Sequence, residues 1–347
     1  MKYSKSLFLL PLLQVSPAAA DYADNAVDSI NKLNNKWYDA NTGLWDKLWW
    51  QSANMITAIA KLGSHDGDFK KTASDIVANT YAKAPGTNGG KWTNNFYDDE
   101  GWWALGWIAS YDMTGDAKYL DTAKSIFEDM TGGWTTPCNG GIWWDKEKTY
   151  ISAISNELFL SVAAHLANRV SNDKQNYIHW AQAEWDWFSN SGIINGENTV
   201  NDGIDKGTCK NNGKTVFTYN QGVVLGGLAE LAKATGDNKY IDSAKAIANG
   251  AIKKLSVDGI LTEWGGVEED VTLAQFKGVF VRGLAALSDE APDQSFADYL
   301  KKNADTIWSK DRDNEGIFGP RWQGPLGTPN AASHASGIDL LVAAAQA

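Results

Sequence analysis

A short unit that recurs along the chain constrains the fold more than any other feature of the sequence. The segments TGDAKYLDTAKSIFEDM (114–130) and TGDNKYIDSAKAIANGA (235–251) match closely. Looser copies occur at HDGDFKKTASDIVANTY, SNDKQNYIHWAQAEWDWF and APDQSFADYLKKNADTIW. In each copy an Asp or Asn can cap the N-terminus, and apolar residues then recur at three- and four-residue spacing. Each copy therefore predicts an amphipathic helix with one side facing solvent.

A second type of helix precedes each copy. NQGVVLGGLAELAKA and QFKGVFVRGLAAL are apolar around most of their circumference and contain glycines despite the helix penalty, which is typical of helices buried on all sides. With the opening segment YADNAVDSINKLNNKWY, the alternation gives six outer and six inner helices. We therefore predict an all-α fold, an (α/α)6 toroid, with residues 21–347 as a single domain. The inner helices are predicted at 50–61, 99–112, 154–170, 219–234, 272–288 and 333–345.

The connections between these helices differ in length at the two ends of the toroid. Inner-to-outer connections such as SHDG, TGD and SND are only a few residues long, as expected between antiparallel neighbours. Outer-to-inner connections are long, and long loops are commonly functional. They all lie where the inner helices begin, so we predict the active site at this long-loop face. The long loops are 84–98, 131–153, 191–218, 255–271 and 310–332.

Tryptophans concentrate in these loops and at the starts of the inner helices. Aromatic rings stack well on the C–H-rich faces of sugars, while neighbouring polar groups hold the hydroxyls. For any single tryptophan a core role is an equal alternative, because large aromatic side chains also dominate cores. As a set on one face with Asn, Gln, Asp and Glu, they favour a carbohydrate cleft. Beside Trp45, Trp49, Trp50, Trp103, Trp134, Trp264 and Trp322, the set includes the candidate substrate contacts Trp92, Trp102, Trp143 and Trp144, to which we add Tyr97.

The segment FYDDEGWWALGWI (96–108) places three acids, Asp98, Asp99 and Glu100, at the start of a predicted inner helix. Acids at a helix N-terminus complement the macrodipole and cap free N–H groups, so capping is one interpretation. A single acid is sufficient for a cap, however. Two carboxylates on either side of a glycosidic bond are the minimum for its hydrolysis, and repulsion between them separates their pKa values. Asp98 and Asp99 are therefore the candidate catalytic residues.

Other polar residues of the same face have two interpretations each. Asn156 and Glu157 open one inner helix, and Tyr219, Asn220 and Gln221 open another. Asn156, Asn220 and Gln221 are candidate substrate-binding residues, although an Asn at such a position can equally be an N-cap. Asp145, after Trp143 and Trp144, is a hydroxyl acceptor or a solvated charge. Lys277 and Arg282 lie on an inner helix, where we expect each to meet a carboxylate such as Asp270 or Glu269.

The first twenty residues have the pattern of a secretory signal peptide. Lys2 and Lys5 precede an apolar run over 7–13, and Ala18, Ala19 and Ala20 supply a cleavage signal. We expect residues 1–20 to be removed and the protein to be secreted, with association with a cell wall as one further prospect. No later segment has the roughly 18 uninterrupted apolar residues of a membrane span. In an exported protein the even cysteine count favours a disulfide, here between Cys138 and Cys209, in the second and third long loops.

The charge of the chain restricts its partners. The formal net charge is −11, and removing Lys2 and Lys5 takes it to −13. An acidic protein is a poor partner for nucleic acid or anionic lipid, so a neutral ligand is favoured. The four histidines form no metal-binding spacing, and we predict no metal and no cofactor. The sequence does not fix the oligomeric state, for which a monomer is the expectation.

Four segments together resemble a known family. FYDDEGWWALGWI, GGIWWDKEKTYISAISNELFL, TYNQGVVLGGLAEL and QFKGVFVRGLAAL, in this order, resemble glycoside hydrolase family 76, the endo-α-1,6-mannanases and their fungal cell-wall relatives. The resemblance covers nearly all of the mature chain, and the paired Asp followed by tryptophans is its most distinctive element. It implies an (α/α)6 fold and retaining cleavage of α-1,6-linked mannan, with Asp98 as nucleophile and Asp99 as acid/base.

Three functions are compatible with this resemblance. The first is a secreted endo-hydrolase acting on the α-1,6-mannan backbone of fungal cell walls or mannoproteins. The second is a transglycosidase that joins lipid-anchor-type mannan cores to wall glucan through the same covalent intermediate, when a sugar outcompetes water. The third is a catalytically silent mannan-binding protein. The C-terminal HASGIDLLVAAAQA is predicted to be the last inner helix rather than an anchor signal, which favours free secretion and the first function.

Overall fold

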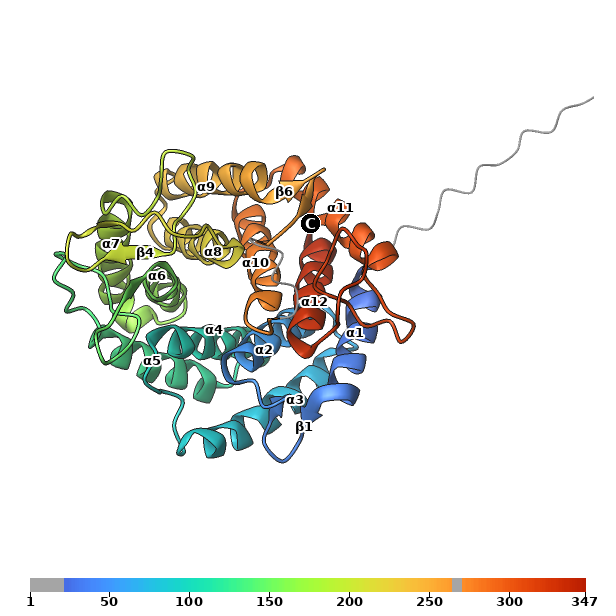
Figure 1. The fold of residues 1–347 in the computed structure, drawn as a ribbon. Coiled ribbons are helices and arrows are strands. Elements are labelled where there is room, and N and C mark those ends of the chain that lie inside the picture. The colour runs from blue at the N-terminus through green and yellow to red at the C-terminus, as the bar shows by residue number, and fades with distance from the viewer. Residues whose placement is uncertain (1–21, 264–269) are drawn as a thin grey trace, which may run out of the picture.

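The computed structural model describes residues 22–263 and 270–347. In these ranges twelve α-helices alternate between two concentric layers (Figure 1), which confirms the predicted (α/α)6 toroid. The inner helices contact one another in the closed order α2, α4, α6, α8, α10, α12 and back to α2. They are α2 (Trp49–His65), α4 (Tyr97–Thr114), α6 (Ala153–Ala167), α8 (Thr218–Thr235), α10 (Phe276–Glu290) and α12 (Ala331–Gln346). The outer helices are α1 (Tyr22–Trp37), α3 (Lys70–Lys83), α5 (Ala117–Thr131), α7 (Lys174–Asn190), α9 (Lys239–Leu255) and α11 (Gln294–Lys310).

Glycines let the inner helices approach one another closely. A Cβ atom added to Gly283 of α10 would lie 1.9 Å from the carbonyl oxygen of Gly222 in α8, a distance no side chain can adopt. A Cβ on Gly222 would in turn lie 2.4 Å from the Cα of Phe280. Glycine therefore costs helix propensity at these positions but permits direct backbone contact between α8 and α10.

The outer helices are amphipathic, as their repeats predict, but their caps are less uniform. Asp116 caps α5 by accepting from the backbone N–H of Lys118, and Asp293 caps α11 by accepting from that of Ser295. Asp173 makes no side-chain cap bond at α7. The predicted start of the fifth inner helix at residue 272 is also early, because 273–275 forms a short 3-10 turn, η4 (Leu273–Gln275), before α10.

Short strands fold the long loops back on themselves at one end of the ring. β3 (Ile151–Ser152), β4 (Gly203–Asp205) and β5 (Lys210–Asn211) form an antiparallel sheet that joins the second long loop to the third. The other strands pair as two-stranded hairpins: β1 (Tyr38–Asp39) with β2 (Leu44–Trp45), and β6 (Ser256–Val257) with β7 (Ile260–Leu261). The remaining short elements are η1 (Ala84–Asn88) and η2 (Ser171–Asp173).

The charges on α10 have partners that the sequence did not identify. Arg282 forms an ion pair of 3.1 Å with Asp339 of α12 and also donates to the side chain of Asn54. The Nζ of Lys277 donates to the carbonyl oxygen of Pro320 at 2.7 Å. The partner of Arg282 therefore comes from the adjacent inner helix rather than from the loop before α10, because Arg282 lies well inside the ring.

Several sequence predictions lie outside the described residues. These are the signal peptide over 1–20, Trp264 and Glu269. Among the described residues, no helix combines the length and apolar character that crossing a bilayer requires.

Candidate active site

The acid run opens α4 at the long-loop end of the ring. Phe96 is the N-cap of this helix and makes no side-chain cap bond, and α4 begins at Tyr97. Asp98 accepts from the backbone N–H of Asp99 at 3.1 Å, so one acid does contact a free N–H of the first turn. Glu100 is fully buried, whereas Asp98 and Asp99 keep part of their surface exposed. Capping thus accounts for one contact of Asp98 but not for the paired, partly exposed carboxyls.

The three acids have three different side-chain donors. The indole N–H of Trp144 donates to Oδ2 of Asp98 at 2.9 Å. The amide of Asn94 donates to Oδ2 of Asp99 at 2.6 Å. The ammonium group of Lys146 lies 2.7 Å from Oε1 of Glu100. Successive helix residues point in directions about 100° apart, which is why consecutive acids meet separate partners.

Burial raises the pKa of both candidate catalytic acids. It raises the pKa of Asp98 to about 7, and the negative charge of Asp99 adds to this effect while the Trp144 indole opposes it. It raises the pKa of Asp99 to about 6, against the Asn94 amide. Interacting carboxyls lose their protons in two steps that belong to the pair, so neither pKa alone says which carboxyl holds the proton. The pair can thus hold one proton near neutrality, the state that acid/base chemistry on a glycosidic bond requires.

A row of aromatic rings crosses the starts of four inner helices. Trp102 of α4 stacks on Trp50 of α2 with ring centroids 5.9 Å apart, and Trp50 meets Phe276 of α10 at 6.2 Å. Phe276 stacks on Tyr219 of α8 at 3.7 Å with nearly parallel planes. Burial, followed by the charges of Asp202 and Asp98, raises the pKa of Tyr219 well above its usual value, so the phenol lies near the acid pair. The row provides apolar ring faces beside the carboxyls.

The loop that carries Trp144 is attached to the start of α4. The carbonyl oxygen of Trp144 accepts from the N–H of Tyr97 at 2.9 Å, and a β-bridge joins Phe96 to Asp145. The Trp144 ring lies between Phe96, at 4.8 Å, and Tyr150, at 6.5 Å. These contacts fix the indole beside Asp98.

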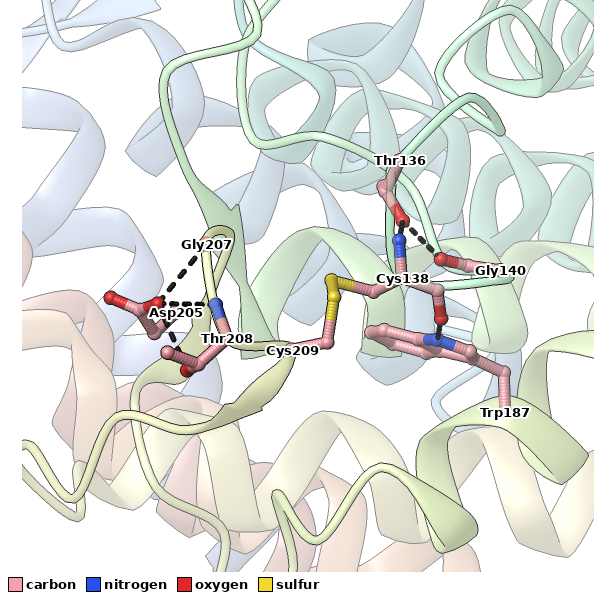
Figure 2. Close-up of a disulfide and its surroundings, with 8 residues drawn as sticks. All are labelled: Thr136, Cys138, Gly140, Trp187, Asp205, Gly207, Thr208 and Cys209. Carbon is pink, nitrogen blue, oxygen red and sulfur yellow. Dashed lines mark hydrogen bonds between the residues drawn. A yellow bond between two sulfur atoms is a disulfide. The ribbon is translucent and has the colours of Figure 1, made fainter.

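The disulfide predicted from the cysteine count is confirmed. Cys138 and Cys209 are bonded with Cα atoms 5.3 Å apart. Figure 2 shows the bond, with the indole N–H of Trp187 donating to the carbonyl oxygen of Cys138. On the other side Asp205 accepts from the N–H groups of the turn that leads to Cys209. The bond therefore joins the loop of Trp144 to the loop that contributes Asp202.

Asn156 and Gln221 are buried and fully engaged, which contradicts their predicted role in substrate binding. The amide of Asn156 bonds both backbone groups of Ile142 and the carbonyl oxygen of Ser152. The amide of Gln221 bonds both backbone groups of Val200 in the same manner. Each side chain points outward and holds the preceding long loop on its inner helix, so neither amide is free to bind a sugar hydroxyl.

Three of the predicted aromatic contacts are packing residues. Trp92 lies between the helix layers, 4.7 Å from the ring of Trp103 and 4.6 Å from that of Trp107. Tyr97 and Trp143 are almost fully buried, and Trp143 donates its N–H to Thr135. Tyr97 and Trp143 offer almost no exposed ring face to a sugar, so the structure corrects these two predictions. Trp92 keeps part of its surface exposed, and its contact with substrate stays a prediction.

Two of the remaining candidates adjoin the acid pair or the aromatic row. Trp144 donates a hydrogen bond to Asp98, and Trp102 belongs to the aromatic row although it is itself largely buried.

Two polar candidates of the same face are also buried. Asn220 is fully buried, and its amide makes no hydrogen bond among the described residues. It is not the N-cap of α8, since Phe217 occupies that position. Asp145 is also buried and accepts from Thr149 within its own loop, so it is not a solvated charge.

Sequence reasoning missed several residues near the acids. Asn94 bonds Asp99, and Tyr150 donates to Oδ2 of Asp202 at 2.6 Å. Both lie in predicted long loops, Asn94 near the end of 84–98 and Asp202 near the middle of 191–218, which was the available signal. Glu184 of α7 was also missed, whereas Glu157 of α6 had been singled out with Asn156. Both glutamates are buried without hydrogen bonds among the described residues, and burial raises the pKa of each well above its usual value.

A cavity of about 320 Å³ opens at the other end of the ring, where the inner helices finish. Lys61, Arg282 and Asp289 line its polar part, and Trp102 contributes to its apolar wall. None of the three acids of the run lines it. The cavity also contains two adjacent carboxyls, Asp289 and Glu290, but Lys61 and Lys233 lie near Asp289. We locate the candidate active site at Asp98 and Asp99, because this pair is set apart from basic side chains.

Fold and site together define a class: an (α/α)6 protein with the paired carboxyls that glycoside hydrolysis requires. The family model described as glycosyl hydrolase family 76 matches residues 14–343. The chain belongs to this family.

The comparisons with individual proteins agree with the family. Mannan endo-1,6-alpha-mannosidase DCW1 of Candida albicans is 31% identical over 158 residues, 41% of this chain and 34% of that protein. Mannan endo-1,6-alpha-mannosidase DFG5 of Saccharomyces cerevisiae is 30% identical over 231 residues, 60% of this chain and 50% of that protein. The matches thus span between about a third and a half of these curated relatives.

Solved structures share the fold across the chain. The GH76A α-1,6-mannanase of Salegentibacter sp. HEL1_6 superposes with a TM-score of 0.84 and 24% identity, covering 94% of this chain and 99% of that one. A second structure of that enzyme has a TM-score of 0.80, 23% identity and the same coverage. It is an inactive variant, with two consecutive aspartates replaced by asparagine, in complex with α-1,6-mannotriose.

Proposed function

We propose that this protein is a secreted, retaining endo-α-1,6-mannanase. The observation that carries the proposal is the adjacent pair Asp98 and Asp99, partly exposed beside a row of aromatic rings. The curated relatives named mannan endo-1,6-alpha-mannosidase support the substrate class. The Salegentibacter mannanase supports the assignment of the pair, because its variant with two consecutive aspartates replaced by asparagine is inactive.

The proposed chemistry uses only this pair. Asp98, ionised, attacks the anomeric carbon of a mannosyl unit, while Asp99 gives its proton to the departing glycosidic oxygen. A water molecule then enters, Asp99 takes a proton from it, and the covalent mannosyl–Asp98 bond is hydrolysed. The aromatic row offers platforms for the sugar rings on either side of the bond. No step of this sequence calls for a metal or a cofactor.

Secretion is part of the proposal and rests on two observations. The pattern of residues 1–20 is that of a signal peptide. The disulfide between Cys138 and Cys209 is a bond that persists in oxidising compartments. The signal-peptide pattern and the disulfide both favour an extracellular enzyme that acts on mannan outside the producing cell.

Digestion of linear α-1,6-mannan tests the proposed function. We expect rapid chain shortening to a ladder of manno-oligosaccharides, because an endo-enzyme cuts internal bonds. The products are sized by chromatography against time. Oligosaccharides longer than the starting material would indicate a transglycosidase, and tight binding without new reducing ends would indicate a binding protein. Either result contradicts hydrolysis as the main activity.

The anomeric form of the first product tests the retaining route. We expect the α anomer, because two displacements at one carbon restore the original configuration. Proton NMR of the reaction within its first minutes distinguishes the anomers before mutarotation mixes them. A first product in the β form would require a water molecule activated by a more distant acid, and Asp98 would then not be the nucleophile.

A further inference from the structure

Asp98 and Asp99 are neighbours of the same chemical type, and the proposed reaction needs them to differ. One must be ionised when the other carries a proton. Burial affects both, so burial alone does not assign the roles. The difference has to come from the groups that contact each carboxyl.

Both contacts of Asp98 are obligate donors. Oδ2 accepts from the indole N–H of Trp144 at 2.9 Å, and the backbone N–H of Asp99 donates to Oδ1 at 3.1 Å. Neither group can accept a hydrogen bond from a protonated carboxyl, because an indole N–H and a backbone N–H are donors only. These two donors favour the ionised form of Asp98 and oppose burial and the charge of Asp99, which together raise its pKa to about 7.

Asp99 is held differently. Its Oδ2 accepts from the amide of Asn94 at 2.6 Å, and its Oδ1 makes no hydrogen bond within the described parts of the chain. The carboxyl is therefore oriented through one oxygen, while the other can carry a proton toward a bound substrate. Asn94 is itself fixed, since its Oδ1 accepts from the N–H of Phe96 at 2.8 Å.

The third acid does not compete for these donors. Glu100 is fully buried and pairs with Lys146, which also contacts Asp129 at 2.6 Å. Lys146 follows Trp144 by two residues, and its backbone N–H donates to Asn95. The loop before α4 and the loop between α5 and α6 thus supply one side-chain donor to each of the three acids.

We propose that Trp144 and Asn94 are positioning residues that make the two catalytic carboxyls inequivalent: Trp144 holds Asp98 as the ionised nucleophile, and Asn94 orients Asp99 as the acid. This proposal rests on the proposed function and deepens it. The other titratable groups in this neighbourhood are Tyr219 of α8, the Glu100–Lys146 pair and Tyr150 beside the Trp144 ring. The carboxyls around the Tyr219 phenol are Asp202, Glu157 and Glu263. None of these donates a hydrogen bond to Asp98 or Asp99 in the described residues. The two acids therefore differ in how they are held: both oxygens of Asp98 accept hydrogen bonds, whereas only Oδ2 of Asp99 does.

The pH dependence of kcat/KM on α-1,6-mannan tests the proposal. In Trp144→Phe, Asp98 loses a donor that stabilises its ionised form, so its pKa rises and the acidic limb moves to higher pH by about one unit. In Asn94→Ala, the pKa of Asp99 rises for the same reason. Because Asp99 must be protonated to act, the basic limb then moves to higher pH by about one unit. Trp144→Phe therefore narrows the pH range over which kcat/KM is high, and Asn94→Ala widens it.

Matched variants separate this effect from packing. Trp143→Phe removes an indole N–H that bonds Thr135, and Asn95→Ala changes the exposed neighbour of Asn94. We expect both to leave the two limbs in place. Thermal melting of all four variants reports any loss of folding. The proposal would be overturned if Trp144→Phe and Asn94→Ala lowered activity without moving either limb of the pH profile. It would also be overturned if both variants moved the same limb.

A readout without substrate keeps the proposal independent of the proposed function. Carbon-13 NMR of labelled aspartate carboxyls follows the pair directly from pH 3 to pH 9, with Asp98→Asn and Asp99→Asn used to assign the signals. We expect Trp144→Phe to raise the titration of Asp98 and Asn94→Ala that of Asp99. Unchanged titrations contradict this inference even if the enzyme cleaves mannan. Shifted titrations in a protein inert toward mannan contradict the proposed function instead.

Discussion

Asp98→Asn and Asp99→Asn are each expected to lower kcat on linear α-1,6-mannan by at least about 1,000-fold. An asparagine amide at position 98 is a poor nucleophile and cannot form the mannosyl ester. At position 99 it has no ionisable proton for the departing oxygen. The side chains are nearly the same size, so the variants should fold. Release of reducing ends, measured at saturating mannan, gives the comparison.

The third acid of the run supplies the control for this expectation. Glu100→Gln changes a carboxyl in the same helical turn, but Glu100 is buried and faces Lys146 rather than the exposed pair. We expect this variant to keep most of its activity, with any loss appearing as a lower melting temperature. If Asp98→Asn and Asp99→Asn both hydrolysed mannan as fast as Glu100→Gln, the acids would be helix caps and the active site would lie elsewhere.

Removing the disulfide is expected to have the largest effect on stability. Replacing both cysteines, Cys138→Ser with Cys209→Ser, should lower the free energy of unfolding by about 4 kcal/mol on the chain-entropy model. The bond closes a loop between positions 71 residues apart, so it removes many conformations from the unfolded chain. Urea denaturation of the oxidised wild type and of the double variant measures the difference.

Reductant provides the control for the disulfide variant. Tris(carboxyethyl)phosphine should lower the stability of the wild type to that of the serine variant and leave the variant unchanged. The KM for mannan should also rise in the variant, because the bond joins the loop of Trp144 to the loop of Asp202. Equal free energies of unfolding with and without the bond would show that the other contacts between these loops, such as the β3–β4 pairing, hold them alone.

The layer arrangement could be predicted from the sequence because it depends on local periodicity. A helix with one wet face, as in 114–130 and 235–251, has to lie outside, and a helix apolar on all sides has to lie within. Loop lengths then separated the two ends of the ring. The acid pair could be found for a related reason: adjacent acids opening a buried helix are conspicuous in the sequence itself. The disulfide followed from a count of two cysteines.

The roles of the other polar residues could not be predicted in this way. Asn156 and Gln221 occupy the first turns of inner helices, as do Asp98 and Asp99, yet they point outward to loop backbone. Asn94 was not singled out, yet it contacts an acid of the pair. The direction in which a side chain points depends on how its helix is rotated about its own axis in the ring. The local sequence does not specify this rotation.

The sequence by itself determined the two layers of helices, the end of the ring that carries the long loops and the position of the acid pair, because the burial of each helix is reflected in the spacing of its apolar residues. Only the tertiary structure decided which partner each polar group meets. Trp144 lies 46 positions from Asp98, and Arg282 lies 57 from Asp339. Such pairs form when distant helices and loops are brought together, and the free energy of each contact depends on that geometry rather than on either residue alone.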